Sequence, residues 1–529
     1  MKNIWQHKKA MKALADGIFR MMCFIVLMLP SIVNAQQPDL GFSREVLSPL
    51  EKKLNLRSSQ EHQNIQPAAF GLEESFYKLQ DSTYSTEKEK NSITLKGFGS
   101  LAGGYQMFDK QQAVGFAFGG GEVGYKLRNK LSVALGYALN GMSPPSYIGQ
   151  MTDARVNPGI GYAVSDKNNL YHTHYTYGHV AYNQGKFFAL EIGKGKHFWG
   201  DGYRSLLVSD NAAPYPYARI TTKVWRLKYT NLWAQMRDMT HGQLLSKARI
   251  KYTASHSLSW NIGKSFNMAI YEMVVWQDRD TMSHRTLDIN YLNPIIFYRP
   301  VEYSVGSPDN VIIGLTFRWK VDKRLQIYGQ FALDEFNLQQ LRLKNDWWAN
   351  KFGGQVGFKA FDLVVEGLSL QMEANAVRPF TYTHGSPVQS WTHLNQSLAH
   401  PLGANFGEWV TFVRYDKNKW RFQEQFIWAS YGRDTDMDGD GIIDNMGGNI
   451  LRSYKAPFKN VGNEMYQGLR SVTHYNSITV SRKIFPNENY EVFLTHILRY
   501  EKNVERKTID NFILVGIQTT GLLQPTRDY

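Results

Sequence analysis

The sequence predicts an all-β fold, namely a large closed antiparallel transmembrane β-barrel of about 16 to 18 strands with a small, partly helical N-terminal periplasmic segment. Three features of the 529 residues carry this prediction: alternation of apolar and polar positions, tight turns that alternate with long loops, and an aromatic content of 14%. Successive side chains of a strand point to opposite faces, which gives period two. A sheet in lipid must close, because open edges would leave unpaired N–H and C=O groups in hydrocarbon.

Residues 1–35 have the features of a cleaved export signal peptide. Basic residues precede an apolar run from Met21 to Val33, and small residues before Gln36 offer a cleavage site. The run is too short to span a bilayer as a mature helix. Cleavage would remove the only cysteine, Cys23. It would also lower the net charge from +14 to +10, since the leader carries five Lys or Arg and one Asp.

Residues 36–92 predict a partly helical periplasmic segment followed by a linker. Ser43 is a suitable helix start, Pro49 limits the helix, and residues 81–92 are polar. Apolar residues follow at helical spacing, at Val46, Leu47, Leu50 and Leu54.

Residues 93–529 form the predicted barrel. From Ala248 to Trp260 the even positions are mostly apolar and the odd ones polar, and Leu325 to Leu333 alternates in the same way. From Trp420 to Ser430 one face carries Trp420, Phe422, Phe426 and Trp428.

The breaks between the strands are of two kinds, as in outer-membrane barrels with tight periplasmic turns and long extracellular loops. Tight turns are predicted at 128–129, 183–186, 262–265, 322–324, 416–419 and 486–489. Long loops are predicted near 141–169, 197–217, 277–309, 334–350, 377–405 and 432–463.

The alternative fold is a large soluble all-β protein, such as a propeller or a β-helix. Strand ends rich in Tyr and Trp, together with the lack of a repeat of constant period, favour the barrel. No apolar run beyond the leader is long enough for a membrane-spanning helix. The predicted location is therefore the outer membrane of a Gram-negative bacterium, with outer-membrane lipid as one partner.

The stretch from Gly193 to Ile220 departs most from strand and turn sequence. Its aromatic faces and hydrogen-bonding groups suit a sugar, whose C–H faces pack on aromatic rings and whose hydroxyls need directed partners. The predicted binding residues are His197, Trp199, Asp201, Tyr203 and Arg204. Two alternatives stay open: the same residues lock the loop, or His197, Asp201 and Ser205 belong to a hydrolase. Catalytic triads depend on spatial geometry, so closeness in sequence is weak evidence. No enzymatic activity is predicted.

Four motifs resemble those of the Wzi-like capsule-assembly outer-membrane proteins, most closely the RemB-like gliding-motility branch. They are WGDGYRSLLVSDNAAPYPYARI in this loop, YLNPIIFYRPVEYSVGSPDN (Tyr291 to Asn310), FALDEF (Phe331 to Phe336) and RPFTYTHGSPVQSWTHLNQSLAHPLGANFGEW (Arg378 to Trp409). The resemblance implies a large barrel with periplasmic helical elements that holds capsular or exopolysaccharide at the cell surface without catalysis.

A second loop is rich in the same residue types. Its predicted polysaccharide-binding residues are Arg378, Tyr382, His384, Trp391 and His393, with His400 and Asn405 nearby. An Arg can hold a sugar carboxylate through two parallel hydrogen bonds. The spacings of the histidines disfavour a compact metal site, and packing inside the lumen is the alternative. Tyr298, Arg299 and Glu302 form a weaker third group.

The segment DTDMDGDGIID, from Asp434 to Asp444, resembles a calcium loop when read from Asp436. Gly441 falls at the sharp bend, and Gly447 stands where an EF-hand has its bidentate Glu. The predicted Ca²⁺ ligands are Asp436, Asp438, Asp440, Asp444 and the carbonyl of Ile442. A structural calcium ion on an outer loop is favoured over a solvated acidic turn.

The predicted function is to bind and anchor capsular or exopolysaccharide at the cell surface. A net charge of +10 after cleavage favours anionic partners, and export disfavours nucleic acid. One alternative is a RemB-like gliding-motility or adhesion accessory that contacts surface-assembly or motility proteins. The other is a porin-like channel for anionic solutes.

Overall fold

The computed structural model describes residues 91–520 with short gaps, together with Lys52, Asn55, His62, Ile65, Gln66 and Asp528. The gaps are 109–110, 129, 149–154, 166–169, 186, 241, 243, 280–284, 286–287, 295–308 and 485–489. The predicted signal peptide, most of the predicted N-terminal segment, and Tyr298, Arg299 and Glu302 lie outside the described residues. No helix among the described residues is long and apolar enough to cross a membrane.

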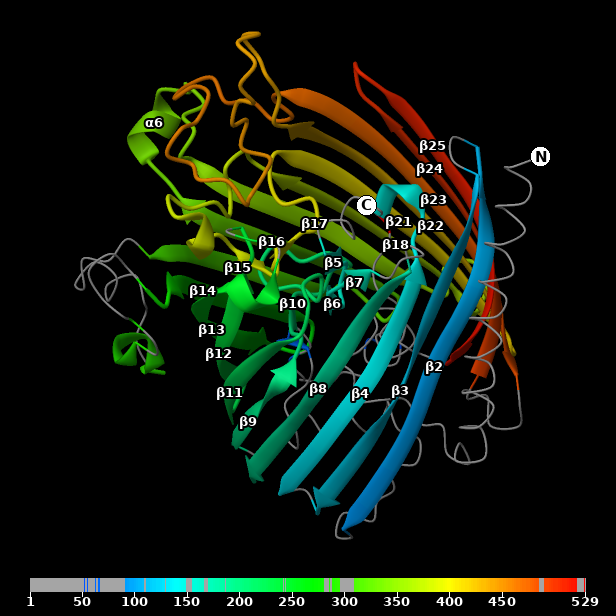
Figure 1. The fold of residues 1–529 in the computed structure, drawn as a ribbon. Coiled ribbons are helices and arrows are strands. Elements are labelled where there is room, and N and C mark those ends of the chain that lie inside the picture. The colour runs from blue at the N-terminus through cyan, green and yellow to red at the C-terminus, as the bar shows by residue number, and fades with distance from the viewer. Residues whose placement is uncertain are drawn as a thin grey trace.

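Eighteen antiparallel strands close into one barrel, which confirms the predicted fold class (Figure 1). The last strand pairs with the first from Ser100↔Gln518 to Met107↔Asn511 and so removes both sheet edges. The strands are β2 (Ser92–Met107), β3 (Gln112–Leu127), β4 (Leu131–Ser143), β8 (Tyr171–Gln184), β9 (Phe188–Gly195), β11 (Tyr215–Val224), β12 (Leu227–Asp238), β13 (Arg249–Ile262), β14 (Phe266–Gln277), β15 (Asn310–Lys320), β16 (Leu325–Glu335), β17 (Lys351–Phe361), β18 (Leu368–Val377), β21 (Phe406–Lys417), β22 (Trp420–Arg433), β23 (Leu469–Ile484), β24 (Tyr490–Lys502) and β25 (Lys507–Thr519).

Shorter elements lie in the connections. One two-residue strand, β7 (Val164–Ser165), extends the barrel wall beside β8. The remaining elements are β1 (Ile65–Gln66) paired with β10 (Phe198–Trp199), β5 (Val156–Asn157) with β6 (Gly161–Tyr162), β19 (Thr392–His393) with β20 (Gln396–Ser397), the 3₁₀ turns η2 (Leu245–Lys247), η3 (Ile289–Leu292) and η4 (Pro387–Gln389), and the helix α6 (Leu338–Arg342).

The two ends of the barrel differ as predicted. All six predicted tight turns fall between consecutive strands at one end, and all six predicted long loops fall at the other. Some connections were not predicted from the sequence. They are the tight turns at 225–226 and 362–367, the loop at 239–248, and two short hairpin connections at the loop end, at 108–111 and 503–506. We call these two ends the turn end and the loop end.

The wall is apolar outside and polar inside. On β13, Leu258 and Trp260 are 42% and 41% exposed on the outer face, whereas Ser255, Ser257 and Ser259 are buried on the inner face. The apolar outer face suits hydrocarbon, and the inner face presents hydrogen-bonding groups to the lumen. The predicted period-two alternation is thus the alternation between lipid and lumen.

The lumen contains segments that enter from both ends. Residues 196–214 and 378–405 fold in from the loop end, and Ile65 of β1 reaches Trp199 of β10 to form a two-stranded pair. Residues nearer the N-terminus contact the turn end, where Asn55 donates to the carbonyls of Asp322 and Lys323 and Lys52 pairs with Asp362 at 2.8 Å. The largest apolar core therefore lies inside the barrel, and Ile65, Trp199 and Trp391 belong to it.

Candidate functional site

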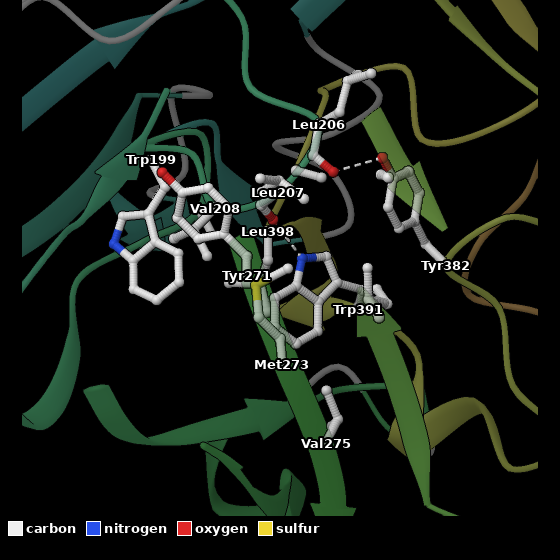
Figure 2. Packing of buried hydrophobic residues seen from close by; sticks show 14 of the residues in the cluster. Trp199, Leu206, Leu207, Val208, Tyr271, Met273, Val275, Tyr382, Trp391 and Leu398 are labelled. Atoms are coloured by element: carbon white, nitrogen blue, oxygen red, sulfur yellow. Dashed lines mark hydrogen bonds between the residues drawn. The ribbon is translucent and has the colours of Figure 1, made fainter. Parts of the chain in front are cut away.

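Residues 196–214 pack against the inner wall of the barrel. Figure 2 shows Trp199, Leu207 and Val208 gathered beside Tyr271 and other inward side chains of β14. The Trp199 and Tyr271 rings lie 5.2 Å apart, and the Trp199 amide donates to the Val208 carbonyl at 2.8 Å. The dense Gly, Pro and aromatic content of this stretch thus forms a compact hairpin-like loop whose apolar side chains are buried.

The loop at 378–405 is hydrogen-bonded to the loop at 196–214. Tyr382 donates its hydroxyl to the Leu206 carbonyl at 2.7 Å, and the Trp391 indole N–H donates to the Leu207 carbonyl at 2.7 Å (Figure 2). The Ser209 amide donates to the Leu398 carbonyl at 2.7 Å. The two loops therefore form one body, which we call the plug.

A buried ion network joins the plug to the wall. The Arg204 guanidinium contacts both carboxylate oxygens of Glu408 at 2.9–3.2 Å and reaches Asp528 at 3.1 Å. His400 contacts Glu408 at 2.7 Å. Burial alone would lower the pKa of Arg204, but the Asp528 and Glu408 carboxylates hold it well above its usual value. A buried charge is tolerated only when it is paired in this way, so the network fixes where the plug sits.

Glu373 on β18 holds the backbone of the plug next to this network. Its carboxylate accepts hydrogen bonds from the amides of Tyr203 at 2.7 Å and Arg204 at 3.0 Å. The side chain of Tyr203 packs edge-on against Phe412 at 4.7 Å and donates to Asp528. Tyr203 is only half-buried, in contrast to Arg204.

Asp201 anchors the opposite end of the same turn. Its carboxylate pairs with Arg318 at 3.0 Å, and its carbonyl accepts from the Lys359 ammonium at 2.6 Å. Gly200 before it has φ of +138°, and a Cβ there would come within 2.0 Å of the Gln330 amide nitrogen. Only glycine allows this close approach of the plug to the wall.

The three residues of the hydrolase alternative have separate partners. Ser205 is fully buried, donates its hydroxyl to the Trp199 carbonyl at 2.6 Å and accepts from the Leu207 amide at 3.1 Å. His197 Nδ1 lies 3.3 Å from the Tyr215 hydroxyl. These contacts give Ser205 a role in shaping the loop and leave no Ser–His hydrogen bond within the plug.

His197 and His393 both contact Tyr215, with ring centroids 5.8 and 5.9 Å from the Tyr215 ring. Burial, reinforced by Arg219, lowers the pKa of His197 to about 3, although Glu191 opposes the shift. Burial and Lys251 lower the pKa of His393 to about 3. His393 Nδ1 accepts from the Arg237 amide at 3.0 Å, so the ring is neutral with its proton on Nε2.

A group of aromatic side chains lies at the loop end, beside the plug. Trp348 has ring contacts with Tyr454 at 5.0 Å, Phe380 at 5.8 Å and Trp347 at 6.0 Å, and His384 lies 5.5 Å from Tyr454. We call Trp347, Trp348, His384 and Tyr454 the rim cluster. The Trp348 amide donates to the Asn460 carbonyl, which joins the loop at 336–350 to the loop at 434–468.

Basic groups surround the rim cluster. Lys455 is exposed next to Tyr454, and the Lys351 ammonium lies 4.6 Å from the Tyr454 ring centroid. Arg378 donates to the Asn350 carbonyl at 3.0 Å and approaches Asp346 at 3.4 Å. Burial and the positive charge of Lys351 lower the pKa of His384 to about 4.

The structure thus divides the predicted polysaccharide-binding residues into two sets. Trp199, Arg204, Tyr382, Trp391 and His393 are at most a few per cent exposed, and His197 and Asp201 are also buried inside the barrel. Contact of this set with a polymer would require the plug to move. Their contacts agree with the alternative role, which is to lock the two loops. Tyr203 is half-buried in the plug. Arg378 and His384 lie at the rim, where His384 is itself 6% exposed and where the structure adds Trp347, Trp348 and Tyr454. In the sequence, the adjacent tryptophans Trp347 and Trp348 in a long loop were the feature that could have indicated this aromatic group.

The predicted calcium loop lies in the 434–468 connection. Asp436, Asp438 and Asp444 each offer a carboxylate oxygen, and the three oxygens lie within 4.8 Å of one another. Asp436 accepts from the amides of Gly439 and Gly441, and these hydrogen bonds lower its pKa. Asp440 accepts from the Ile442 amide at 2.7 Å.

Gly441 has φ of +85°, as the sharp bend of such a loop requires. Asp434 pairs with Arg452 at 2.8 Å. The carboxylate donors Asp436, Asp438 and Asp444 have the hard-oxygen chemistry that Ca²⁺ takes, and Ca²⁺ binding stays a prediction.

No protein-family model matches the chain, and no curated protein matches it. Among solved structures, the chain is similar to Wzi of Escherichia coli, described as an outer membrane protein involved in group 1 capsule assembly and as a carbohydrate binding beta-barrel. The similarity covers 91% of this chain and 99% of Wzi, with a TM-score of 0.53 and 11% identity. The fold is Wzi-like. The predicted similarity to the RemB-like branch stays a prediction.

Two further solved structures, both from Pseudomonas aeruginosa, are also similar. OccK8 (OprE) matches over 80% of this chain and 97% of its own, with a TM-score of 0.43 and 9% identity. OprD matches over 82% of this chain and 98% of its own, with a TM-score of 0.41 and 8% identity. Similarity at these identities describes the fold, and the function has to be argued from the residues of this chain.

Acidification is expected to loosen the plug. His197 and His393 are neutral in the folded protein, with pKa values far below the ordinary 6.5. When the plug opens, the two histidines regain their ordinary pKa and take up protons below about pH 6.5, whereas in the closed plug they stay neutral. Their contribution to the stability of the closed plug is therefore complete above about pH 6.5 and is lost as the pH falls. The protection factors of residues 196–214 and 378–405, which correct the exchange rates for the intrinsic pH dependence of amide exchange, should be smaller at about pH 4.5 than at about pH 7.5, with β2–β4 as the internal control. Equal protection factors at both pH values would contradict this assignment.

Calcium is expected to bind the acidic loop with a Kd of about 10⁻⁴ to 10⁻³ M, which is the range of extracellular sites. Changing Asp436→Asn together with Asp438→Asn should abolish the heat of binding in calorimetric titration, because two of the three clustered carboxylates lose their charge. Asp416→Asn, at the turn end, is the control and should leave binding unchanged. Undiminished calcium binding in the double variant would show that this loop is not the calcium site.

Proposed function

We propose that this protein binds and anchors an acidic capsular or exopolysaccharide at the cell surface. The binding surface is the one that the plug and the long loops form at the loop end of the barrel. The observation that carries the proposal is the filled lumen. Two loops from one end, and β1 bound to one of them, occupy the barrel interior with a continuous apolar core and a buried ion network. Because the lumen is filled, a ligand has to bind at the surface of the loop end and not inside the barrel.

The chemistry of the rim cluster suits such a polymer. Trp347, Trp348 and Tyr454 present partly exposed aromatic rings on which the C–H faces of sugars pack. Lys455 and Arg378 supply cations for uronate or pyruvyl carboxylates, Arg through paired hydrogen bonds. The exposed Lys344 and Lys459 on the same loops add positive charge. The rim cluster and the basic side chains next to it therefore combine the stacking and the charge that an acidic polysaccharide needs.

The buried residues of the plug act indirectly in this proposal. Trp199 and Arg204 hold residues 196–214 to the wall, and Tyr382 and Trp391 hold the second loop to the first. The loop that contains Tyr382 also supplies His384 to the rim cluster. A fixed plug therefore presents a fixed binding surface, which lowers the entropy cost of binding.

The Wzi-like fold supports the proposal, since Wzi is described as a carbohydrate binding barrel involved in capsule assembly. The motifs that resemble the RemB-like branch suggest a role in surface motility or adhesion. Adhesive slime and capsule polymer are chemically similar, so both roles would use the same outer surface and the same binding physics.

Changing Trp347→Ala together with Lys455→Glu is expected to abolish retention of acidic exopolysaccharide, because the variant loses one stacking ring and reverses one exposed charge. Retention is measured as polymer that co-purifies with the protein and as binding of purified polymer to protein in detergent. The matched control is Trp225→Ala together with Lys264→Glu, which changes the same residue types at the turn end, where Trp225 is 73% exposed.

The control variant should retain polymer like the unchanged protein. If the rim variant also retains it fully while migrating as a heat-resistant barrel, the rim cluster is not the binding surface. Absence of binding by the unchanged protein to any acidic polysaccharide of its own cells would overturn the proposed function itself.

A further inference from the structure

Four polar residues form a diagonal stripe on the lipid-facing side of consecutive strands β22 to β25. They are Glu424, Asn476, His496 and Asn511, and we call them the wall stripe. Their direction follows from their strand neighbours. Gln423 and Gln425, on either side of Glu424, are buried and contact Arg414 and Asp528 inside the barrel. Glu424 therefore points outward.

The same alternation holds on the other three strands. On β24, Thr495 and Ile497 are buried inward, so His496 between them points outward. Asn476 on β23 and Asn511 on β25 are likewise flanked by residues that are buried on the inner face: Tyr475, Ser477, Asp510 and Phe512.

The wall stripe is continuous across the four strands. The register pairs Glu424 with Ile478, Asn476 with Leu498 and His496 with Ile513. Each member therefore lies diagonally across from the next, at a spacing that polar side chains can bridge. Asn476 donates to the Glu424 carboxylate at 3.0 Å, and His496 Nε2 lies 3.0 Å from the side-chain amide oxygen Oδ1 of Asn511.

Apolar side chains flank the wall stripe on β22, β24 and β25, whereas on β23 the outward neighbours of Asn476 are His474 and Ile478. Phe422 and Phe426 flank Glu424 on β22, and Leu494 and Leu498 flank His496 on β24. Ile513 and Val515 continue the apolar surface on β25, where Val515 is 61% exposed. Trp420, which marks the aromatic edge of this surface at the turn end, lies four positions before Glu424 in the sequence. The wall stripe thus lies within the band that faces hydrocarbon.

Contact with lipid acyl chains is unfavourable for these polar groups. A carboxylate or imidazole on the lipid face of a barrel destabilises it, and an ionisable residue in the membrane normally meets a polar partner. In the described part of the chain, Glu424 has a single hydrogen bond and no ion pair. Its remaining oxygen and the free amide protons of Asn511 would otherwise stay unpaired next to acyl chains.

We propose that β22–β25 form the contact between two copies of this chain in the membrane. The wall stripe contains hydrogen-bond acceptors at Glu424, donors and acceptors at both asparagines, and an imidazole that can do either. It is therefore complementary to itself. A two-fold axis between β23 and β24 lets the two stripes cross at Asn476 and His496, as an isologous interface requires. The flanking Phe, Leu, Ile and Val side chains pack around the polar seam.

Cysteine cross-linking tests the contact directly, since the chain has only Cys23. In a Cys23→Ser background, Ile478→Cys lies between Glu424 and His496 in the register and should give an oxidised dimer in the native membrane. Val356→Cys, which is exposed on the lipid face of β17, is the matched control and should stay monomeric. Equal cross-linking at both positions, or none at Ile478→Cys, would overturn the proposal.

Substitution of the wall stripe separates polar pairing from apolar packing. Glu424→Leu together with His496→Leu should convert the dimer to a monomer in mass measurements in detergent and in nanodiscs, while the barrel stays heat-resistant. Glu424→Gln together with His496→Gln keeps hydrogen-bonding groups and should stay dimeric. A monomeric unchanged protein in nanodiscs, or cross-linking of Ile478→Cys to a different protein, would refute contact between two copies.

Discussion

The polar inner face of the barrel needs hydrogen-bonding partners, and the rest of the structure depends on how these are supplied. A carboxylate such as Glu373 or Glu408 is buried in the lumen and would be costly there without a partner. The plug provides those partners through the Tyr203 and Arg204 amides and the Arg204 guanidinium. One set of contacts therefore gives hydrogen-bonding partners both to the buried groups of the wall and to the backbone of the loop. For this reason the same residues close the lumen and fix the position of the plug.

The filled lumen in turn decides where function is expected. Apolar side chains of the plug, such as Leu207 and Trp391, pack on the inner face of β14 where a channel would need open space. The outer ends of the loops then carry the partly exposed rings of the rim cluster and the basic groups next to it. The outer wall carries a different kind of surface, since Glu424 and His496 are polar groups in an apolar band. The proposed ligand binding and the proposed self-association therefore involve separate faces of the barrel.

The fold could be predicted from the sequence because its signals are local. Alternation from Ala248 to Trp260 and breaks such as 262–265 depend only on neighbouring residues, and they gave the strands, the two ends and the closure. The partners inside the lumen could not be predicted, because Arg204 meets Glu408 and Ile65 meets Trp199 across long stretches of chain. For the same reason, exposure of Trp199 to sugar was expected where the structure shows burial. Glu424 did have a local signal, since it occupies an apolar position in the alternation of β22.

Electrical conductance across a planar bilayer tests the filled lumen most directly. The unchanged protein should insert without forming a stable open channel. A variant in which a short Gly-Ser linker replaces residues 196–214 should conduct ions steadily, provided that it still migrates as a heat-resistant barrel. A steady open channel in the unchanged protein, equal to that of the variant, would contradict the account, because the plug would then not close the barrel.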